Sequence, residues 1–476
     1  MGIRRHIAIT FVSKYLEMGL GLLGSVVLAR LLTPEDFGIY SIAASIVLIG
    51  YLFRNFGVGQ MIVQADKLTD DLLRAAFALT LAISWGIGLL LALIAPWAGD
   101  FYASPGVTQV LYFLALNFVL LPFGAVSDAV LRRRMAFDKL AVISVASSLV
   151  GVVVGIGSAW LGARYLAIAW SGNASTLTTI LLTLVYRPKG LPWKPGLRGM
   201  REVFRFGMKV GTMDMVNKGS DSLSEMLIGK AHGLHQLGIY SRAYGAFMLF
   251  EYAFIEGIRP VVLPYLSEAR RGEGNLGVIY LRIVNYAAIF MLPFFAYLAI
   301  AAPEVMRVLY GAQWDASVPL LRLMCGAGAL LSVTIFFDQL LIARGRPGQA
   351  LFYQSMGQAA RLTALLFLLS GNLLAVAMAV LVGAAVKAML VVRLARQHFA
   401  LNIGQFAREI LPAVGVAIVV GAAVAVSSRW LTGFSSELLR FVGLSLVALI
   451  SWLTMLFALR HPLSVEMRRW MPVGRS

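Results

Sequence analysis

Long apolar stretches alternate with short polar connections along most of the chain. A helix that crosses a bilayer needs about 20 mostly apolar residues, and the sequence contains roughly fourteen stretches of that kind. The pattern therefore predicts an all-α polytopic membrane protein with about 14 transmembrane helices. The expected segments are 10–30, 36–63, 72–97, 106–129, 140–161, 165–186, 206–229, 236–266, 278–301, 316–342, 348–369, 372–393, 408–428 and 437–459.

Composition excludes other classes of protein. Of the 476 residues, 59% are hydrophobic and 13% are charged, which lies outside the range of soluble domains. A net charge of +18 is also found in nucleic-acid-binding proteins, but here the basic residues lie in the connections between helices. We therefore expect no nucleic-acid partner. The single cysteine, Cys325, excludes an internal disulfide.

Lysines and arginines fall in alternate connections, and this sets the expected orientation. Positively charged loops close to helix ends stay in the cytoplasm. Turns such as Thr33 to Asp36, Gly99 to Phe101 and Ser370 to Asn372 carry no positive charge. Both termini are therefore expected to be cytoplasmic. The basic connections include Arg4-Arg5, Arg132 to Arg134 with Lys139, Arg187 to Arg205, Arg270-Arg271, Arg344 with Arg346, Arg393 with Arg396, and Arg468-Arg469.

An internal repeat organises the chain. Gly38-Ile39-Tyr40-Ser41 recurs as Gly238-Ile239-Tyr240-Ser241, and Arg30 and Lys230 precede the two copies at the same spacing. Repeated membrane units are the usual build of a transporter. We expect two six-helix lobes related by this repeat, at 1–186 and 206–395, followed at 396–476 by two additional helices and a basic cytoplasmic tail.

Residues 187–205 join the two expected lobes. The stretch contains Pro188, Pro192 and Pro195, and apolar residues alternate with arginines toward its end. This pattern indicates a basic cytoplasmic linker that ends in an interfacial helix. A role as hinge and topogenic signal is favoured over binding of specific lipid head groups.

Charged residues inside the spanning segments are the candidate chemistry, because a charge at membrane depth is costly and normally faces a polar interior. Segment 206–229 has the densest set, spaced by four, three and four positions along one stripe of a helix. Lys14 and Glu17 take corresponding positions in the first segment, so both helices are expected to line one cavity. The alternative is that internal ion pairs serve helix packing alone. The stripe consists of Asp214, Lys218, Asp221 and Glu225, with Asn217 beside it.

Two arginines are candidates for binding phosphate. The guanidinium groups of Arg54 and Arg361 offer a planar fork of donors and keep their charge at any physiological pH. Asn55, Asn117 and Glu251 are further polar candidates. The residues expected to line the substrate cavity are Lys14, Glu17, Arg54, Asn55, Asp214, Asn217, Lys218, Asp221, Glu225, Glu251 and Arg361.

The sequence lacks the signatures of common enzyme and metal sites. It has no Gly-Lys-Ser/Thr loop, no His-Glu-x-x-His and no cysteine cluster. His232-Gly233-Leu234-His235 has metal-like spacing, but without a third ligand nearby it is expected to be an ordinary turn. Gly151 and Gly155 are expected to be notches for helix packing. We therefore expect no enzyme activity, catalytic residue, cofactor or metal.

Three stretches of the N-terminal region resemble a known family. The stretches are Leu28-Ala29-Arg30-Leu31-Leu32-Thr33-Pro34-Glu35-Asp36-Phe37-Gly38-Ile39-Tyr40, then Phe56-Gly57-Val58-Gly59 with Ile62-Val63-Gln64, and Leu131-Arg132-Arg133-Arg134-Met135-Ala136-Phe137. They are similar to bacterial polysaccharide-synthesis flippases of the Wzx type, particularly colanic-acid-like members, in the multidrug, oligosaccharidyl-lipid and polysaccharide exporter superfamily.

The resemblance implies a transporter of the bacterial inner membrane. Such proteins move lipid-linked oligosaccharide repeat units, typically linked to undecaprenyl pyrophosphate, from the cytoplasmic to the periplasmic leaflet. They transport by alternating access, and the repeat units that they move are used to build surface polysaccharides such as lipopolysaccharide or exopolysaccharide. The implied partners are this substrate, membrane lipids, and the polysaccharide polymerase and export machinery. The matched motif is structural, so it transfers no substrate-binding residue.

The mixed charges keep other interpretations open. Relatives use a central cationic cavity, whereas this chain adds Asp214, Asp221 and Glu225. These carboxylates indicate coupling of transport to a proton or sodium gradient. One alternative is an ion-coupled exporter of small amphiphiles. Another is a membrane glycosyltransferase or polymerase. The chain lacks the sizeable extramembrane loop that usually holds the sugars in such enzymes, which argues against this alternative.

Overall fold

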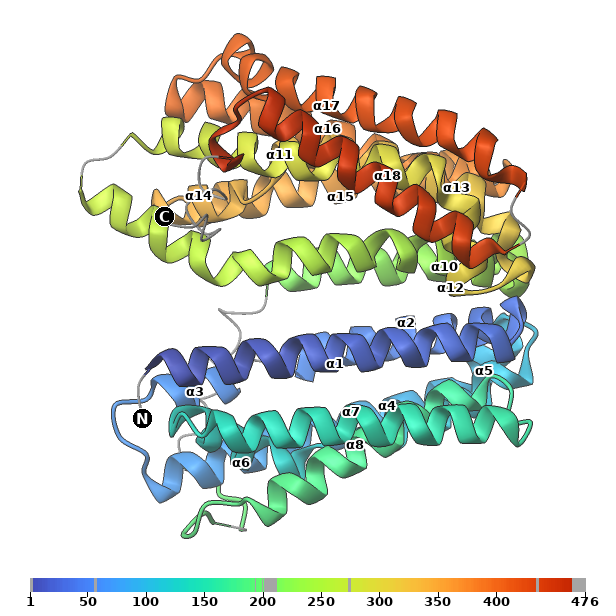
Figure 1. Cartoon of the computed structure of the whole chain (residues 1–476). Coiled ribbons are helices and arrows are strands. Elements are labelled where there is room, and N and C mark those ends of the chain that lie inside the picture. Colours follow the sequence, from blue (N-terminus) through green and yellow to red (C-terminus); the bar gives the residue numbers. More distant parts are fainter. Residues whose placement is uncertain are drawn as a thin grey trace, which may run out of the picture. The chain divides into compact units, whose positions relative to one another are not determined.

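The computed structural model describes residues 3–54, 58–192, 194–198, 200, 212–272, 275–433 and 436–464. Within these ranges, the side chains of 3–8, 212–214, 250–254, 256–261 and 432 are outside the description. Helices make up most of the described chain, and no strand occurs in it (Figure 1). The predicted fold class, an all-α polytopic membrane protein, is confirmed.

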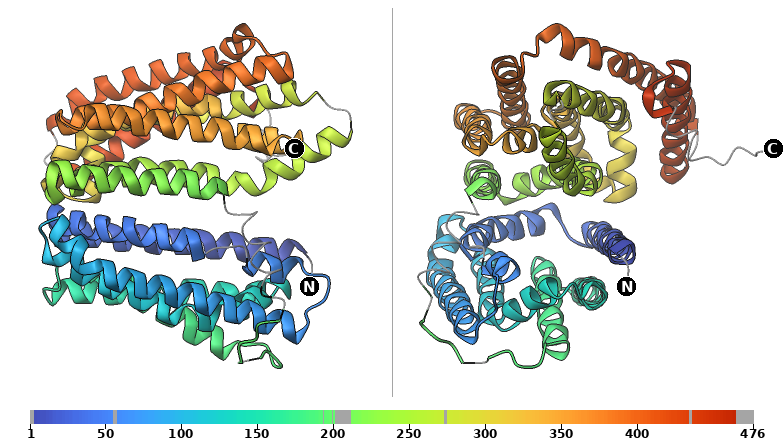
Figure 2. Two further views of the ribbon diagram at one scale, coloured as in Figure 1. Left: turned by 180° about the vertical axis from the view of Figure 1, so that it is seen from behind. Right: turned by 90° about the vertical axis from the view of Figure 1, so that its left-hand side faces the viewer.

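The first of two compact units comprises Met1–Ser241. Its long helices run alongside one another, as Figure 1 and the end-on view in Figure 2 show. Helix α7 packs against α1 and α8, while α5 packs against α2, α4 and α8. The helices are α1 (Ile3–Leu31), α2 (Pro34–Arg54), α3 (Val58–Gln64), α4 (Asp70–Phe101), α5 (Pro105–Leu120), α6 (Pro122–Arg133), α7 (Phe137–Trp160), α8 (Leu166–Val185) and the first part of α10 (Thr212–Arg271).

The second compact unit comprises Arg242–Ser476. Helix α11 packs against α13 and α17, and α16 packs against α13 and α15. The predicted lobe boundaries at 186, 205 and 395 stay predictions. Beyond the rest of α10, the helices are α11 (Leu276–Ile300), α12 (Ala302–Leu309), α13 (Val318–Leu331), α14 (Phe337–Ala343), α15 (Pro347–Leu368), α16 (Leu373–Phe399), α17 (Ile403–Trp430) and α18 (Glu437–Ala458), with short 3₁₀ turns η1 (Ala312–Ser317), η2 (Ser332–Thr334) and η3 (Leu431–Gly433).

Where the structure describes them, the predicted spanning segments fall on these helices or on pairs of them; residues 55–57 and 206–211 lie outside the described residues. Segment 36–63 is formed by α2 and α3, and segment 106–129 by α5 and α6, which are bent by 53°. Among the described residues, ten helices are long and apolar enough to cross a membrane, or eleven if that bent pair is one span. The count of about fourteen stays a prediction.

The break predicted around His232-Gly233 divides α10. Gly233 has φ +83° and ψ 168°, whereas the residues on either side are helical. This positive φ is costly for a side chain with a Cβ, and glycine adopts it freely. The break therefore separates the polar stripe before Gly233 from the second copy of the repeated tetrapeptide after it.

The turn before α2 is held by its own side chains. Asp36 is only 2% exposed, and its carboxylate accepts hydrogen bonds from the Thr33 amide at 3.1 Å and the Thr33 hydroxyl at 2.7 Å. The Thr33 hydroxyl in turn accepts from the Asp36 amide at 3.2 Å, which is reciprocal capping of a helix start. Arg164 adds an ion pair to Asp36 at 3.3 Å. The family-like motif therefore fixes the entry into α2.

The two copies of the repeated tetrapeptide contact each other within the N-terminal unit. A Cβ on Gly38 would overlap the carbonyl oxygen of Leu234, and a Cβ on Gly238 would overlap the carbonyl oxygen of Pro34. Each carbonyl lies four residues before the other glycine, so the contact is reciprocal. Only glycine allows backbones to approach this closely, which explains why this residue type appears in both copies.

Small residues also bring α7 and α8 together, as predicted. A Cβ on Gly155 would lie 2.7 Å from the Ser171 Cβ, and one on Gly151 would lie 3.0 Å from the Ser171 carbonyl oxygen. These glycines therefore act as packing notches.

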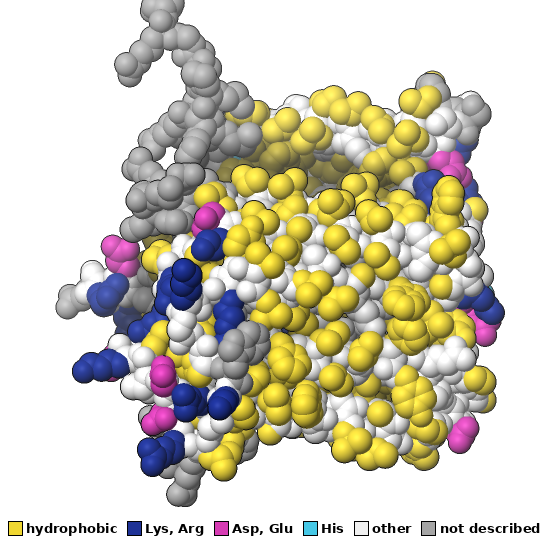
Figure 3. Space-filling view, turned by 90° about the horizontal axis from the view of Figure 1, so that it is seen from below, with side chains coloured by type: hydrophobic (Ala, Val, Ile, Leu, Met, Phe, Trp, Pro, Cys, Tyr) yellow, Lys and Arg dark blue, Asp and Glu magenta, His cyan; other side chains and the backbone are white. Residues whose placement is uncertain are grey.

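Basic side chains gather at one end of the visible face in Figure 3, while a broad zone beside them is apolar. An apolar belt with a basic end is what the positive-inside pattern requires. The orientation of the termini stays a prediction.

Candidate functional site

A polar pocket lies within the N-terminal unit among α2, α5, α8 and the first part of α10. Its volume is about 330 Å³. It is lined by Tyr40, Ala44, Ser45, Val47, Leu48, Tyr51, Leu114, Asn117, Gly172, Thr176, Asp221, Ser222 and Glu225. Two carboxylates, an amide and several hydroxyls thus face a space within otherwise apolar helices.

A hydrogen bond links two helices across this pocket. The Ser45 hydroxyl on α2 donates to a carboxylate oxygen of Glu225 on α10 at 2.5 Å. Ser45 is 3% exposed, so the bond is shielded from solvent. The bond therefore holds the Glu225 side chain at a fixed place in the pocket wall.

Two buried oxygens in the same wall lack a hydrogen-bond partner among the described residues. They are Oδ1 of Asn117, 3% exposed, and Oγ of Ser222, 2% exposed. Burying a polar group without a partner costs about 1–3 kcal/mol. A wall that keeps two such groups beside a cavity is suited to a polar ligand that completes their bonds.

Of the predicted cavity residues, the structure brings Asp221 and Glu225 into this pocket. They are four positions apart and therefore share one helix face. On the same helix, Asn217 is half-buried and Lys218 is exposed, and neither lines the pocket. On α1, Lys14 is exposed and Glu17 half-buried, also away from the pocket.

Arg54 ends α2 one turn beyond the pocket. Its guanidinium carbon lies 6.0 Å from the ring centroid of Tyr51, which lines the pocket, and its buried Nε has no hydrogen-bond partner among the described residues. Asn55 lies outside the described residues. The side chains of Asp214 and Glu251 also lie outside the description.

Arg361 belongs to a separate basic cluster in the C-terminal unit. Its side chain on α15 is 7% exposed, and the guanidinium lies 5.4 Å from the ring centroid of Tyr244. Gly383 of α16 contacts it closely, since a Cβ there would lie 2.7 Å from the Arg361 Cβ. The side chain of Lys387 on α16 packs closely against Gly357 of α15, where a Cβ would overlap it. Glycines therefore leave room for two cations where α15 and α16 pack together.

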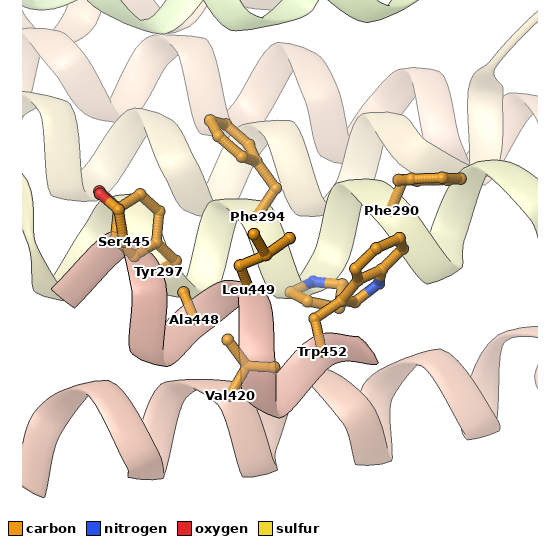
Figure 4. A pocket seen from close by; sticks show the side chains of 9 residues that line it. Phe290, Phe294, Tyr297, Val420, Ser445, Ala448, Leu449 and Trp452 are labelled. Carbon is orange, nitrogen blue, oxygen red and sulfur yellow. The ribbon is translucent and has the colours of Figure 1, made fainter. Parts of the chain in front are cut away.

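An apolar pocket of about 280 Å³ lies elsewhere in the C-terminal unit, among α11, α17 and α18 (Figure 4). Its polar groups bond within the protein. The hydroxyls of Tyr297 and Ser445 are 2.7 Å apart, and the Trp452 indole donates to the Ile289 carbonyl at 2.9 Å. The remaining lining residues are Phe290, Pro293, Phe294, Val420, Ala448 and Leu449.

Reasoning from charge missed several groups near these sites. Ser45, Ser222 and Thr176 line the polar pocket, but single hydroxyls are common in helices and give no strong signal. Lys387 did carry a signal, because it is a cation within the long apolar run of α16.

The comparisons with known proteins identify the family. A family model described as polysaccharide biosynthesis protein matches residues 27–319. This chain belongs to that family. The matched region includes the motifs that predicted the resemblance from sequence, so that prediction is confirmed.

Proteins similar to this chain include two that are named for polysaccharide biosynthesis. The lipopolysaccharide biosynthesis protein WzxC of Escherichia coli (strain K12) is 23% identical over 340 residues, which cover 70% of this chain and 68% of WzxC. The succinoglycan biosynthesis transport protein ExoT of Rhizobium meliloti (strain 1021) is 24% identical over 369 residues, covering 76% and 73%.

Solved structures show the fold of this polysaccharide biosynthesis protein. The lipid II flippase MurJ, in an inward closed conformation, matches with a TM-score of 0.76 at 12% identity, covering 94% of this chain and 98% of MurJ. An inward-facing multidrug resistance MATE family transporter of the MOP superfamily matches with a TM-score of 0.62 at 15% identity, covering 81% and 94%. The predicted two-lobe helical fold of this superfamily is thereby confirmed.

Proposed function

We propose that this protein is a flippase. In this proposal it moves lipid-linked oligosaccharide repeat units, of the undecaprenyl-pyrophosphate type, from the cytoplasmic to the periplasmic leaflet for surface polysaccharide synthesis. The observation that carries the proposal is the polar pocket in a membrane protein of the polysaccharide biosynthesis family. It holds two half-buried carboxylates and two buried oxygens without a hydrogen-bond partner among the described residues. The relatives named as a transport protein and as a flippase support it.

Sugars suit such a pocket chemically. Each sugar hydroxyl both donates and accepts hydrogen bonds, so it satisfies carboxylate and amide oxygens that would otherwise stay unpaired. Crossing hydrocarbon without partners costs several kcal/mol per polar group. A route lined by Asn117, Ser222 and Glu225 lowers that cost for the sugars, while the isoprenoid tail stays in lipid.

The diphosphate of the substrate needs cations. In the C-terminal unit, Arg361 offers a planar fork of donors and Lys387 a compact charge. In the N-terminal unit, Arg54 adds a guanidinium beside the pocket residue Tyr51. These three residues are our candidates for phosphate recognition.

We further propose that the carboxylates couple transport to a proton or sodium gradient. Asp221 and Glu225 lie in one pocket at predicted membrane depth, where protonation or a bound cation lowers the cost of burying them. Binding that favours one conformation then drives alternating access. On this proposal the chain is a transporter and not an enzyme.

The proposed location is the bacterial inner membrane with both termini in the cytoplasm, and the proposed partners include the polysaccharide polymerase and export machinery. The basic end seen in Figure 3 supports the orientation. Reporter fusions that are active only on one side of the membrane, placed at each terminus and in the predicted outer turn at Ser370 to Asn372, test it.

The leaflet location of lipid-linked oligosaccharides tests the flippase function. In cells that lack the protein, we expect these lipids to accumulate on the cytoplasmic leaflet, and the wild-type protein to restore export. Asn117→Leu and Arg361→Ala are expected not to restore it. Asn173→Leu is the matched control. Asn173 of α8 is also buried, and its Oδ1 has no hydrogen-bond partner among the residues that the structure describes, but it does not line the pocket.

Other outcomes point to other functions. Outward-facing intermediates that fail to polymerise would indicate a polymerase or glycosyltransferase. Unchanged lipid-linked sugars would indicate an exporter of small amphiphiles. Export restored in full by Asn117→Leu and Arg361→Ala would contradict the site assignment while leaving the function intact.

A further inference from the structure

A second pocket of the N-terminal unit lies where α6, α7 and α8 meet the linker. Its volume is about 430 Å³. One wall comes from the end of α6 and the start of α7, and the other from the end of α8 and the residues after it. The lining residues are Leu131, Arg134, Ala136, Lys139, Val185, Tyr186, Arg187, Pro188 and Lys189.

The charge of this basic pocket has a single sign. Arg134, Lys139, Arg187 and Lys189 are cationic, and none of the residues that line the pocket is acidic. Burial also lowers the pKa of the Arg187 guanidinium, because loss of water disfavours its charged form. An anion bound in this pocket would be attracted by all four cations that line it.

The linker backbone anchors one of these cations. The Nη2 of Arg187 donates to the Leu191 carbonyl at 2.8 Å and to the Pro192 carbonyl at 3.1 Å. Lys139 lies against an aromatic wall, with its Nζ 5.9 Å from the ring centroid of Tyr186. The pocket is therefore built from ordered groups on both sides, and its occupation bears directly on the first residues of the linker.

The surroundings indicate the kind of anion. Val185 is 75% exposed on the last turn of α8, so an apolar surface adjoins the cations at the end of a membrane helix. Phosphate groups of lipids lie at this level of a bilayer, directly above their acyl chains. A soluble phosphate would gain nothing from the apolar rim.

We propose that this basic pocket binds the phosphate of an anionic membrane lipid and thereby holds the start of the linker at the membrane surface. The inference is independent of the sugar substrate and of the coupling ion. It differs from the topogenic role expected from sequence, because a topogenic signal requires only net positive charge whereas a binding site requires these particular residues.

Lipid binding to the full-length purified protein tests the proposal. The protein is reconstituted in nanodiscs of phosphatidylcholine with or without phosphatidylglycerol, and bound lipid and melting temperature are measured. We expect phosphatidylglycerol to bind preferentially and to raise the melting temperature. Arg134→Gln and Arg187→Gln are each expected to weaken that binding roughly fivefold, the effect of one cation near the surface.

Arg132→Gln is the matched control. Arg132 lies in the same basic connection but pairs with Asp128 at 2.7 Å and does not line the pocket. Lys139→Gln and Lys189→Gln, at exposed positions, provide a second test if the arginine variants are unstable. Retained binding in Arg132→Gln, with loss in the pocket variants, supports the proposal.

Three results would overturn it. Equal loss in Arg132→Gln would show a diffuse charge effect. Binding of phosphatidylcholine as strongly as phosphatidylglycerol would show that the pocket does not select an anionic lipid. Stabilisation of lipid-free, detergent-solubilised protein by inorganic phosphate to the same degree would assign the pocket to a soluble anion. Because none of these readouts involves sugar export, failure here leaves the proposed flippase function untouched.

Discussion

The polar pocket of the N-terminal unit and the apolar pocket of the C-terminal unit have similar volumes but opposite chemistry. In the apolar pocket, the hydroxyl of Tyr297 and the indole of Trp452 bond within the protein (Figure 4). In the polar pocket, oxygens of Asn117 and Ser222 lack a hydrogen-bond partner in the described part of the chain and lie in the same wall as Glu225. Stability favours the first arrangement, since paired polar groups cost little. The second arrangement costs stability, and a ligand that bonds to those oxygens explains why it is kept. The apolar pocket therefore serves packing, whereas the polar pocket is suited to binding.

The largest effect is expected at Glu225. Glu225→Gln removes the charge but keeps the shape, and its amide oxygen still accepts from Ser45. We expect export to fall roughly tenfold or more, because the substrate loses a hydrogen bond to a charged group. Folding stability should not fall. The leaflet assay and thermal melting in nanodiscs measure the two quantities. Normal export by this variant would show that Glu225 takes no part in transport and that the polar pocket, like the apolar one, serves packing.

The next largest effect is expected where the repeated tetrapeptides meet, since the first of them contains the pocket residue Tyr40. Gly238→Ala places a methyl group against the Pro34 carbonyl, and backbone yields less than a side chain, so we expect about 1–3 kcal/mol of destabilisation with reduced export. Gly245→Ala, seven residues later and facing open space, is the control.

Gly38→Ala strains the same contact from the other side. Because both substitutions separate one pair of helix ends, the double variant should lose less stability than the sum of the singles. Additive losses, or an equal loss in Gly245→Ala, would show that the two glycines do not share a contact.

A smaller effect is expected in the apolar pocket. The Ser445 hydroxyl donates to the Phe441 carbonyl, so the Tyr297 hydroxyl is the donor to Ser445. Tyr297→Phe removes this single bond, and we expect about 1 kcal/mol of lost stability with export unchanged. Thermal melting and the leaflet assay check this. Loss of export at normal stability would mean that the apolar pocket also handles substrate.

The smallest effect concerns pH and the connection after α18. His461 is 5% exposed; its Nε2 lies 2.6 Å from Oδ1 of Asn285, and its Nδ1 accepts from the Leu463 amide. These bonds fit the neutral ring, and burial lowers the pKa of His461 from its usual 6.5. The unfolded chain therefore binds the proton more readily, so stability is complete above about pH 6.5 and falls as the pH drops below it.

Melting temperatures between pH 8 and pH 5 measure this dependence, and His461→Gln should flatten part of it. Protonation adds a second N–H at Nδ1, which removes the acceptor for the Leu463 amide and loosens the connection after α18. The Nε2 bond to Asn285, which also donates to the Glu409 carbonyl at 3.0 Å, is kept. An identical pH dependence in the variant would show that other groups account for it.

Much of the fold could be predicted because its causes are local. Runs of about 20 apolar residues define helices wherever they occur in the chain. Gly233 breaks α10 because glycine alone adopts its φ freely, and Thr33 caps α2 with Asp36 three residues away. The resemblance over Leu28 to Tyr40 also predicted the family that the comparisons then confirmed.

The candidate site could be predicted only in part. The rule that charges at membrane depth face polar interiors pointed to Asp221 and Glu225, which do share a pocket. It pointed equally to Lys14 and Lys218, which are exposed. Sequence spacing shows which residues share one face of a helix. It does not show which part of that face is covered by a neighbouring helix and which part is exposed.

By itself, then, the sequence determined the helices, their breaks and their caps, because each depends on residues a few positions apart. Only the tertiary structure decided that Ser45 meets Glu225 and that Gly38 and Gly238 contact each other's turns. Such pairs are far apart in the chain, and they form through the rotation and approach of whole helices, which is set by the packing of all their side chains together.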